Sequence, residues 1–285
     1  MRLKKTLYSL LLASSLLLVS CSEEGVLFSK NYVGTGEVVT NIIQLTGTET
    51  ISDFSIKLGN IMFGESKDFE GEVPYLDVNF YDYGEPRVEV ITNQNIFDHL
   101  TYKVSDSAFE LTENTTDKYV TNTFTMNFYG ISISEATLEG ASHLANSLYA
   151  FEDETRLTIK GATTGTLNLE NVDNFSLDVK GTATLKLENL SLDYLKNEVT
   201  GVASLSGSGS IDKYEDSISG VATMAFSDIK TKEFYINSRG AANYIIAVSD
   251  ILDIKSSGTL TVKYKGNPAL TTQVAGAYDV SKIDN

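Results

Sequence analysis

A repeat of about 20 residues runs from Thr155 to Gly266, and it limits the fold of this chain more than any other feature. Apolar and polar residues alternate within each repeat, which is the spacing of a β-strand. Glycines recur at nearly constant steps, at Gly161, Gly181, Gly201, Gly220, Gly240 and Gly258. Self-similarity at this period is typical of a solenoid, in which each coil buries its apolar face against the next.

Three sets of apolar residues also align when the repeats are written below one another. The sets are Ile159, Val179, Val199, Ile218, Ile236 and Ile254; Ala183, Ala203, Ala222 and Ala242; and Leu167, Leu185, Leu205, Met224, Tyr244 and Leu260. No repeat has the i, i+3, i+4 spacing of a helix, so a helical solenoid is excluded. We predict an all-β parallel β-helix with ladders of like residues inside. Glycine should lie where a side chain would collide with the opposite wall.

The first half of the chain has the same alternation without a regular period. Short strand-like segments lie between Asn31 and Tyr129, and a helical turn is expected within Asn95–Leu100. Solenoids need a cap that covers the core of their end coils. We therefore expect this half to form a less regular N-terminal β cap.

The N-terminus has the features of an export signal. Basic residues at Arg2, Lys4 and Lys5 precede an apolar segment that is too short to span a membrane. The segment ends in Leu18–Cys21, which resembles the lipobox of bacterial lipoprotein signal peptides. That resemblance implies removal of residues 1–20, a diacylglycerol on Cys21 with further acylation such as palmitate, a tether over 21–33 and a folded domain over 34–285.

This resemblance also implies a location. The anchor would hold the chain on the outer membrane, where lipid is its first partner. The acidic pair Glu23-Glu24 is similar to the signals that send some lipoproteins to the cell surface. Cys21 is the only cysteine, so the chain has no intramolecular disulfide.

The charge of the chain excludes one class of partner. Its net charge is −16, and removal of the basic signal peptide makes it more negative. Such a surface repels nucleic acid and anionic lipid. We expect no nucleic-acid binding.

Acidic residues in the repeats offer a candidate cation site. Glu170 and Glu188 are expected to stack on the outer face of adjacent coils, as are Asp178 and Glu198. Stacked carboxylates can bind calcium, although the chain lacks the aspartate-rich nonapeptide repeat of calcium-binding solenoids. Ordinary surface ion pairs are the alternative. The two histidines have no cysteine or third histidine beside them, so no metal centre or cofactor is predicted.

Tyrosines offer a second candidate site. Tyr75, Tyr81 and Tyr83 lie close together in the sequence, before Gly84. Exposed aromatic rings can stack on sugars, which suggests a glycan contact. A packed edge of the cap is the alternative.

Several segments resemble a known family, the putative auto-transporter adhesins with a head GIN domain (DUF2807). They are Gly34–Val39, Ile51–Leu58, Leu138–Ser142, Lys265–Pro268, Val274–Ala277 and Val280–Ile283. The resemblance implies a right-handed β-helix on an exported bacterial lipoprotein with an adhesin-like role. It brings no catalytic motif.

Our leading hypothesis is a non-catalytic, lipid-anchored binding module. Its β-helix wall would face a glycan or a protein of the host or cell envelope, in contacts repeated from coil to coil. A polysaccharide lyase or hydrolase that uses surface carboxylates is the alternative, because β-helices also host such enzymes. An accessory role in envelope signalling is a third hypothesis. The sequence leaves the oligomeric state open.

Overall fold

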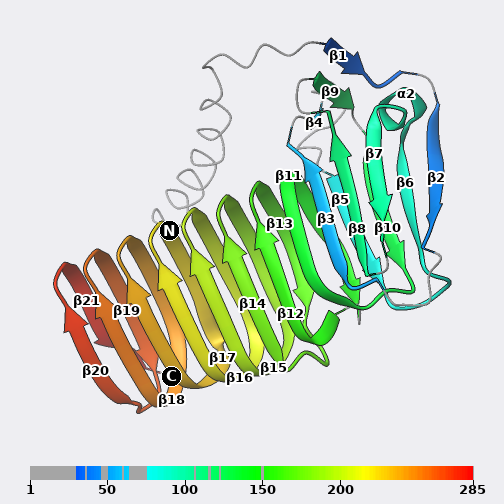
Figure 1. Cartoon of the computed structure of the whole chain (residues 1–285). Coiled ribbons are helices and arrows are strands. Elements are labelled where there is room, and N and C mark those ends of the chain that lie inside the picture. The colour runs from blue at the N-terminus through cyan, green and yellow to red at the C-terminus, as the bar shows by residue number, and fades with distance from the viewer. Residues whose placement is uncertain are drawn as a thin grey trace.

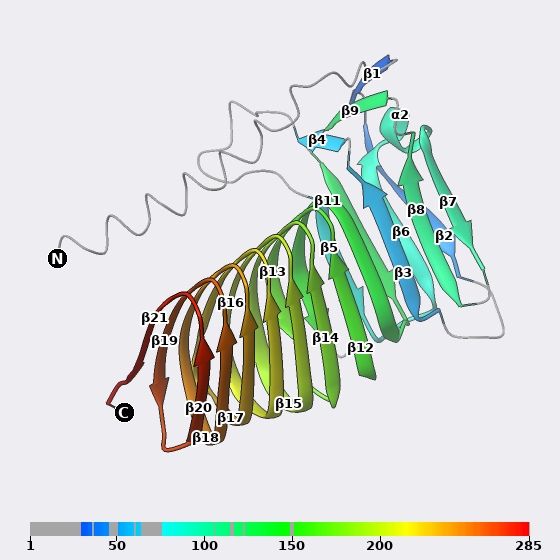
Figure 2. The ribbon, with the colours of Figure 1, turned by 60° about the vertical axis from the view of Figure 1, so that its left-hand side comes forward.

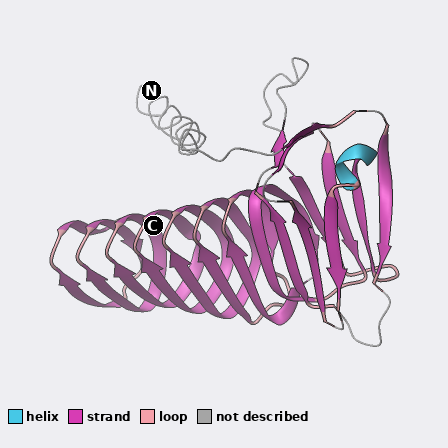
Figure 3. Cartoon of the chain, turned by 45° about the horizontal axis from the view of Figure 1, so that its top comes forward, coloured by secondary structure: helices cyan, strands magenta, loops and turns pink. Residues whose placement is uncertain are grey.

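A computed structural model shows a protein built almost entirely of β-strands (Figure 3). The residues it describes are 30–35, 37–45, 51–59, 61–63, 76–105, 107–114, 117–121, 123–148 and 151–284. Among these residues, no helix is long and apolar enough to cross a membrane. The predicted signal peptide and Cys21 lie outside the described residues.

The C-terminal half is a parallel β-solenoid of about seven turns, which confirms the predicted β-helix (Figure 1). The long strands bend near their middle, so each supplies one segment to each of two facing walls (Figure 2). Its strands are β11 (Ile133–Leu148), β12 (Phe151–Ile159), β13 (Ala162–Asn168), β14 (Asn174–Val179), β15 (Thr182–Val199), β16 (Val202–Ile218), β17 (Val221–Ser238), β18 (Ala241–Ser256), β19 (Thr259–Lys265), β20 (Ala269–Val274) and β21 (Ala277–Lys282).

The predicted glycine column is a continuous file along the solenoid. A Cβ atom at Gly181 would lie 1.9 Å from the carbonyl oxygen of Gly161, and one at Gly201 would lie 1.9 Å from that of Gly181. Only glycine allows the backbones of adjacent coils to approach this closely. The predicted reason was wrong in one respect, because the obstacle is the neighbouring coil and not the opposite wall.

The apolar columns are confirmed in part. Ala183, Ala203, Ala222 and Ala242 do stack in register. Other predicted neighbours do not: Ile218 pairs with Ser238 rather than Ile236, Leu260 pairs with Ala242, and Leu167 pairs with Leu187. The buried Ser238 and Ser256 continue the column of Ile218. The strand register keeps the glycines aligned. The sequence alignment that matched apolar residues was wrong by two residues at these positions.

The N-terminal half forms the expected less regular cap. The predicted helical turn is the short helix α2 (Gln94–Phe97), which ends shortly before β7. The cap strands are β1 (Lys30–Val33), β2 (Val38–Gln44), β3 (Asp53–Leu58), β4 (Ile61–Phe63), β5 (Leu76–Tyr81), β6 (Arg87–Asn93), β7 (Leu100–Val104), β8 (Ala108–Glu113), β9 (Asp117–Thr121) and β10 (Phe124–Tyr129).

One strand joins the cap to the solenoid. β11 pairs with β3 and β5 of the cap, and also with β12 and β13 of the solenoid. A single apolar core therefore continues through both halves. In the cap this core contains the rings of Phe54, Phe80, Phe109 and Phe128, and the rings of Phe54 and Phe128 meet edge to face at 5.0 Å.

Candidate functional site

The outer face of the cap brings three tyrosines together. β5 and β10 are parallel, and their register sets Tyr81 directly beside Tyr129. The two rings stack with their centroids 4.8 Å apart. Tyr83, which follows β5, lies 5.3 Å from Tyr81 and 6.0 Å from Tyr129, and 61% of it is exposed. Tyr81 and Tyr129 are half-buried and Tyr83 is exposed, so the cluster is partly open to solvent.

An arginine completes this cluster. β6 runs antiparallel to β10 and sets Arg87 beside Tyr129, with the guanidinium carbon 4.0 Å from the centre of the tyrosine ring. The Arg87 Nε atom also donates a 2.9 Å hydrogen bond to Glu89. Burial raises the pKa of Tyr129, and the Glu89 carboxylate adds to this shift. We call Tyr81, Tyr83, Tyr129 and Arg87 the tyrosine platform.

Two glycine turns hold the platform in place. The Gly130 amide donates a 2.9 Å hydrogen bond to the Tyr83 carbonyl oxygen, which ties the turn after β5 to the turn after β10. Gly130 has a φ of +60°, and a Cβ there would lie 2.4 Å from the Gly84 carbonyl oxygen. A larger residue at Gly130 would therefore push Tyr83 away from Tyr129.

The tyrosine prediction is partly testable in this structure. Tyr81 and Tyr83 do lie together at an exposed site, whereas Tyr75 lies outside the described residues. Sequence reasoning missed Tyr129 and Arg87. A repeated tyrosine–glycine pair was the available signal, because Tyr129-Gly130 matches Tyr83-Gly84.

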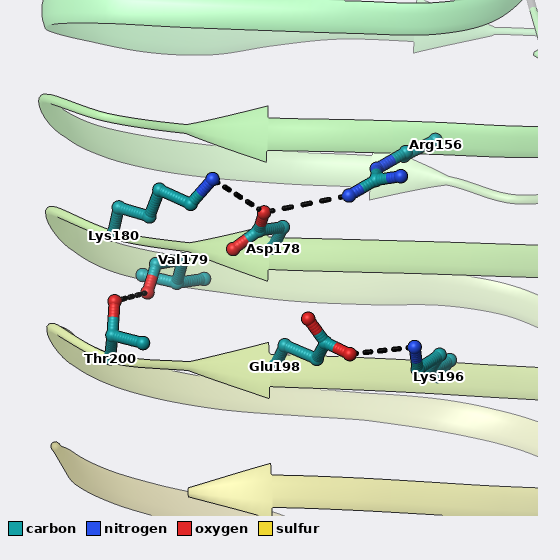
Figure 4. Close-up of polar contacts among 7 residues, drawn as sticks. All are labelled: Arg156, Asp178, Val179, Lys180, Lys196, Glu198 and Thr200. Carbon is teal, nitrogen blue, oxygen red and sulfur yellow. Dashed lines mark hydrogen bonds and ion pairs between the residues drawn. The ribbon is translucent and has the colours of Figure 1, made fainter. Parts of the chain in front are cut away.

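The pairing of Asp178 with Glu198 on adjacent coils is found as expected. Both carboxylates, however, already contact basic side chains of the same wall (Figure 4). Asp178 lies 3.0 Å from Lys180 and 3.6 Å from Arg156, and Glu198 lies 2.6 Å from Lys196. These contacts favour ordinary ion pairs over a calcium site.

The expected stacking of Glu170 on Glu188 is wrong. Asn168, the last residue of β13, pairs with Glu188, and Glu170 follows in the turn. The Asn168 side-chain oxygen accepts a 3.1 Å hydrogen bond from the Glu170 amide. Glu188 lies 2.5 Å from Lys186. In the described part of the chain, no three histidine, cysteine or acidic residues gather as a metal site, and calcium binding stays a prediction.

A polar cluster inside the solenoid was also missed. Asp216 is only 2% exposed, accepts a 2.8 Å hydrogen bond from the Tyr244 hydroxyl and accepts a 2.9 Å hydrogen bond from the Asn197 amide. Burial raises the pKa of Asp216 to about 7, although these hydrogen bonds oppose the shift. Burial also raises the pKa of the Tyr214 and Tyr244 hydroxyl groups well above the ordinary value. The enclosed carboxyl group has little access to a substrate, so we assign it a structural role.

The two histidines lie in separate surroundings. The His99 ring lies 3.7 Å from that of Tyr32, and the His143 Nδ1 atom lies 3.0 Å from the Thr164 hydroxyl. Both contacts are consistent with packing roles.

Comparison with known proteins identifies a matching family model over residues 73–268, described as "Putative auto-transporter adhesin, head GIN domain". A comparison with curated proteins finds no match.

Solved structures share the fold at low sequence identity. A putative adhesin from Parabacteroides distasonis has a TM-score of 0.66 at 16% identity, over 89% of this chain and 100% of its own. A putative adhesin from Parabacteroides merdae has a TM-score of 0.57 at 18% identity, over 89% and 99%. A putative lipid binding protein from P. distasonis has a TM-score of 0.59 at 14% identity, over 89% and 100%.

Proposed function

Because the chain belongs to the head GIN domain family of putative auto-transporter adhesins, we propose that it is a non-catalytic, adhesin-like binding protein of the cell envelope. The family supports an exported or cell-surface protein with an adhesin-like role. The finer proposal adds a lipid anchor at Cys21 on the outer membrane and a partner that is a glycan.

The tyrosine platform is the observation that supports a glycan partner. Tyrosine and arginine, with tryptophan, are enriched where the binding energy of protein interfaces is concentrated, since they combine large apolar area with polar groups. Tyr81, Tyr83 and Tyr129 offer ring faces for the apolar face of a sugar. The Arg87 guanidinium and the tyrosine hydroxyls can bond to sugar oxygens. No charged ligand is required, which suits a chain with a net charge of −16.

Binding of the mature chain to an immobilised glycan panel tests this proposal. We expect Tyr83→Ala to weaken binding by about 10-fold or more, as loss of a central aromatic contact does. Tyr102→Ala is the matched control, because Tyr102 is also an exposed cap tyrosine but lies on β7, which does not pair with β5, β6 or β10. Equal binding by both variants, or none by the unmodified chain, would argue against the platform.

The lipid anchor needs a separate test. Cells that express the chain with labelled palmitate should incorporate label into the protein, and Cys21→Ala should abolish it. An unlabelled chain in the outer-membrane fraction would contradict the anchor and leave the platform untouched.

Polysaccharide cleavage remains the alternative function. The ion pairs of Asp178 and Glu198 count against it, since a catalytic carboxylate must be able to reach the substrate. Release of reducing ends or unsaturated products from any bound polysaccharide would favour this alternative.

A further inference from the structure

The two ends of the solenoid differ. The cap covers the first coils, whereas β20 and β21 form the last coil at the opposite end (Figure 2). β20 pairs only with β18, and β21 pairs only with β19, among the described residues. Each of these strands therefore has one side whose backbone groups have no strand neighbour, an arrangement that recruits further strands.

The apolar core reaches solvent at this end. Leu252 is 0% exposed, but Leu270, its neighbour on the last coil, is 43% exposed. Leu260 is 1% exposed, and its neighbour Tyr278 is 59% exposed. The core columns therefore continue into the last coil without a covering layer in the described chain.

We propose that this end is an interface where a second copy of the chain docks, with β20 and β21 extending the walls into those of the partner. Only a partner with the same coil outline covers both open edges and the core between them. A single peptide strand would cover one edge. An end-to-end contact between identical surfaces is isologous and closes as a dimer, so it does not grow into a filament.

Charge favours this occupant. β20 contains no charged residue, and β21 contains one acid and one base, Asp279 and Lys282. The two end strands together are therefore neutral in a chain whose net charge is −16. Native sheet edges are commonly protected by charges or prolines, and β20 has neither.

The sequence of β21 also suits pairing with its own copy. Core-facing residues must face the core of the partner, so the join has to preserve the alternation along the strand. An antiparallel register centred on Val280 meets this condition. It sets Val280 against its copy, Tyr278 against Lys282, and Asp279 against Ser281. No like charges oppose one another, and a lysine lies beside an aromatic ring.

Sedimentation equilibrium of the mature chain with Cys21→Ser tests the proposal, because this change removes both the anchor and the native thiol. We expect a dimer whose dissociation constant rises at least ~10-fold in Leu270→Lys/Tyr278→Lys. Val221→Lys is the matched control, because it adds a charge at an exposed apolar residue on the side of the solenoid. A monomer at about 100 µM, or equal effects in both variants, would overturn the proposal.

Crosslinking distinguishes this interface from other dimers. In the Cys21→Ser background, Val280→Cys should form a disulfide-linked dimer on mild oxidation, because the register sets this position against its copy. Val221→Cys should form no disulfide-linked dimer, because this position lies away from the proposed interface. A dimer that crosslinks through Val221→Cys but not Val280→Cys would place the interface elsewhere. Thermal unfolding of each variant checks that the single chain stays folded.

Discussion

The Tyr244 hydroxyl donates a 2.8 Å hydrogen bond to the Asp216 carboxyl group, and both residues are enclosed in the solenoid. Tyr244 lies on β18 and Asp216 on β16, so the bond spans two coils. Asn197 on β15 donates to the same carboxyl group. A polar link thus connects three strands inside a largely apolar core, and we expect it to make stability depend on pH.

Stability should fall as pH rises from 5 to 8.5. Burial raises the pKa of Asp216 to about 7 in the folded chain, from 3.8 for the ordinary group. The folded state therefore binds the proton more tightly, and its stabilisation is lost as pH rises through the folded pKa. The loss is on the order of a few kcal/mol. Denaturant unfolding at several pH values measures it.

Asp216→Asn isolates this effect. The variant should lose most of the fall between pH 5 and 8.5 and be the more stable protein at pH 8.5. At pH 5 it should be slightly less stable, by about 1 kcal/mol, because one amide oxygen replaces two acceptors. Asp193→Asn, the same change at an exposed position, is the control. An unchanged pH dependence in Asp216→Asn would contradict this assignment.

Alanine should not fit in the glycine file. Gly201→Ala puts a Cβ 1.9 Å from the Gly181 carbonyl oxygen, and the two coils must separate to relieve the clash. We expect a loss of about 3 kcal/mol in the free energy of unfolding, the upper range for overpacking. At Gly59, a Cβ would meet nothing closer than 4.0 Å, so Gly59→Ala should change stability by about 0.5 kcal/mol or less. Similar values for both variants would contradict the close approach of the coils.

Arg87 should stabilise the platform through the Tyr129 ring. A double-mutant cycle with Arg87→Ala and Tyr129→Leu should give a coupling energy of about 0.5–1 kcal/mol, typical of an exposed cation–π contact. The same cycle with Tyr102→Leu should give none, because β7 does not pair with β6. Equal coupling energies in both cycles would mean that the 4.0 Å contact between Arg87 and the Tyr129 ring contributes no specific stabilisation.

Calcium should have little effect on the unfolding temperature. Lys180 and Lys196 already neutralise Asp178 and Glu198, so an added cation has to displace them. About 1 mM calcium, enough for the weak sites of extracellular modules, should shift the midpoint no more than magnesium does. A specific rise of several degrees with calcium would restore the predicted cation site.

The sequence predicted the fold well where a backbone constraint repeats. The glycine file from Gly161 to Gly258 can be predicted from the sequence, because no other residue fits there and each glycine therefore identifies its position in the coil. The apolar columns are harder to predict, because apolar residues and even a serine can occupy equivalent positions. An alignment by residue type therefore places Ile236 beside Ile218, whereas Ser238 is its true neighbour. The cap was predicted only as irregular strands because its pairings join residues far apart in the chain.

The candidate site was predictable only within one strand and its turn. Tyr81 and Tyr83 are neighbours in sequence, whereas Tyr129 and Arg87 reach them through the pairing of β10 with β5 and β6. The buried Asp216 could not be inferred either. An aspartate in a sequence is usually expected at the surface. The partners that allow its burial, Asn197 and Tyr244, lie on other coils.

The repetition of identical contacts from coil to coil makes the molecule adjustable in length. Each long strand pairs only with the strands of the coil before and the coil after it, so one coil can be gained or lost while the same steric fit at glycine is restored at the new junction. Such a change would move the far end by about 5 Å and leave the tyrosine-bearing face unaltered. The length of the solenoid can thus vary without any change in the tyrosine platform on the cap.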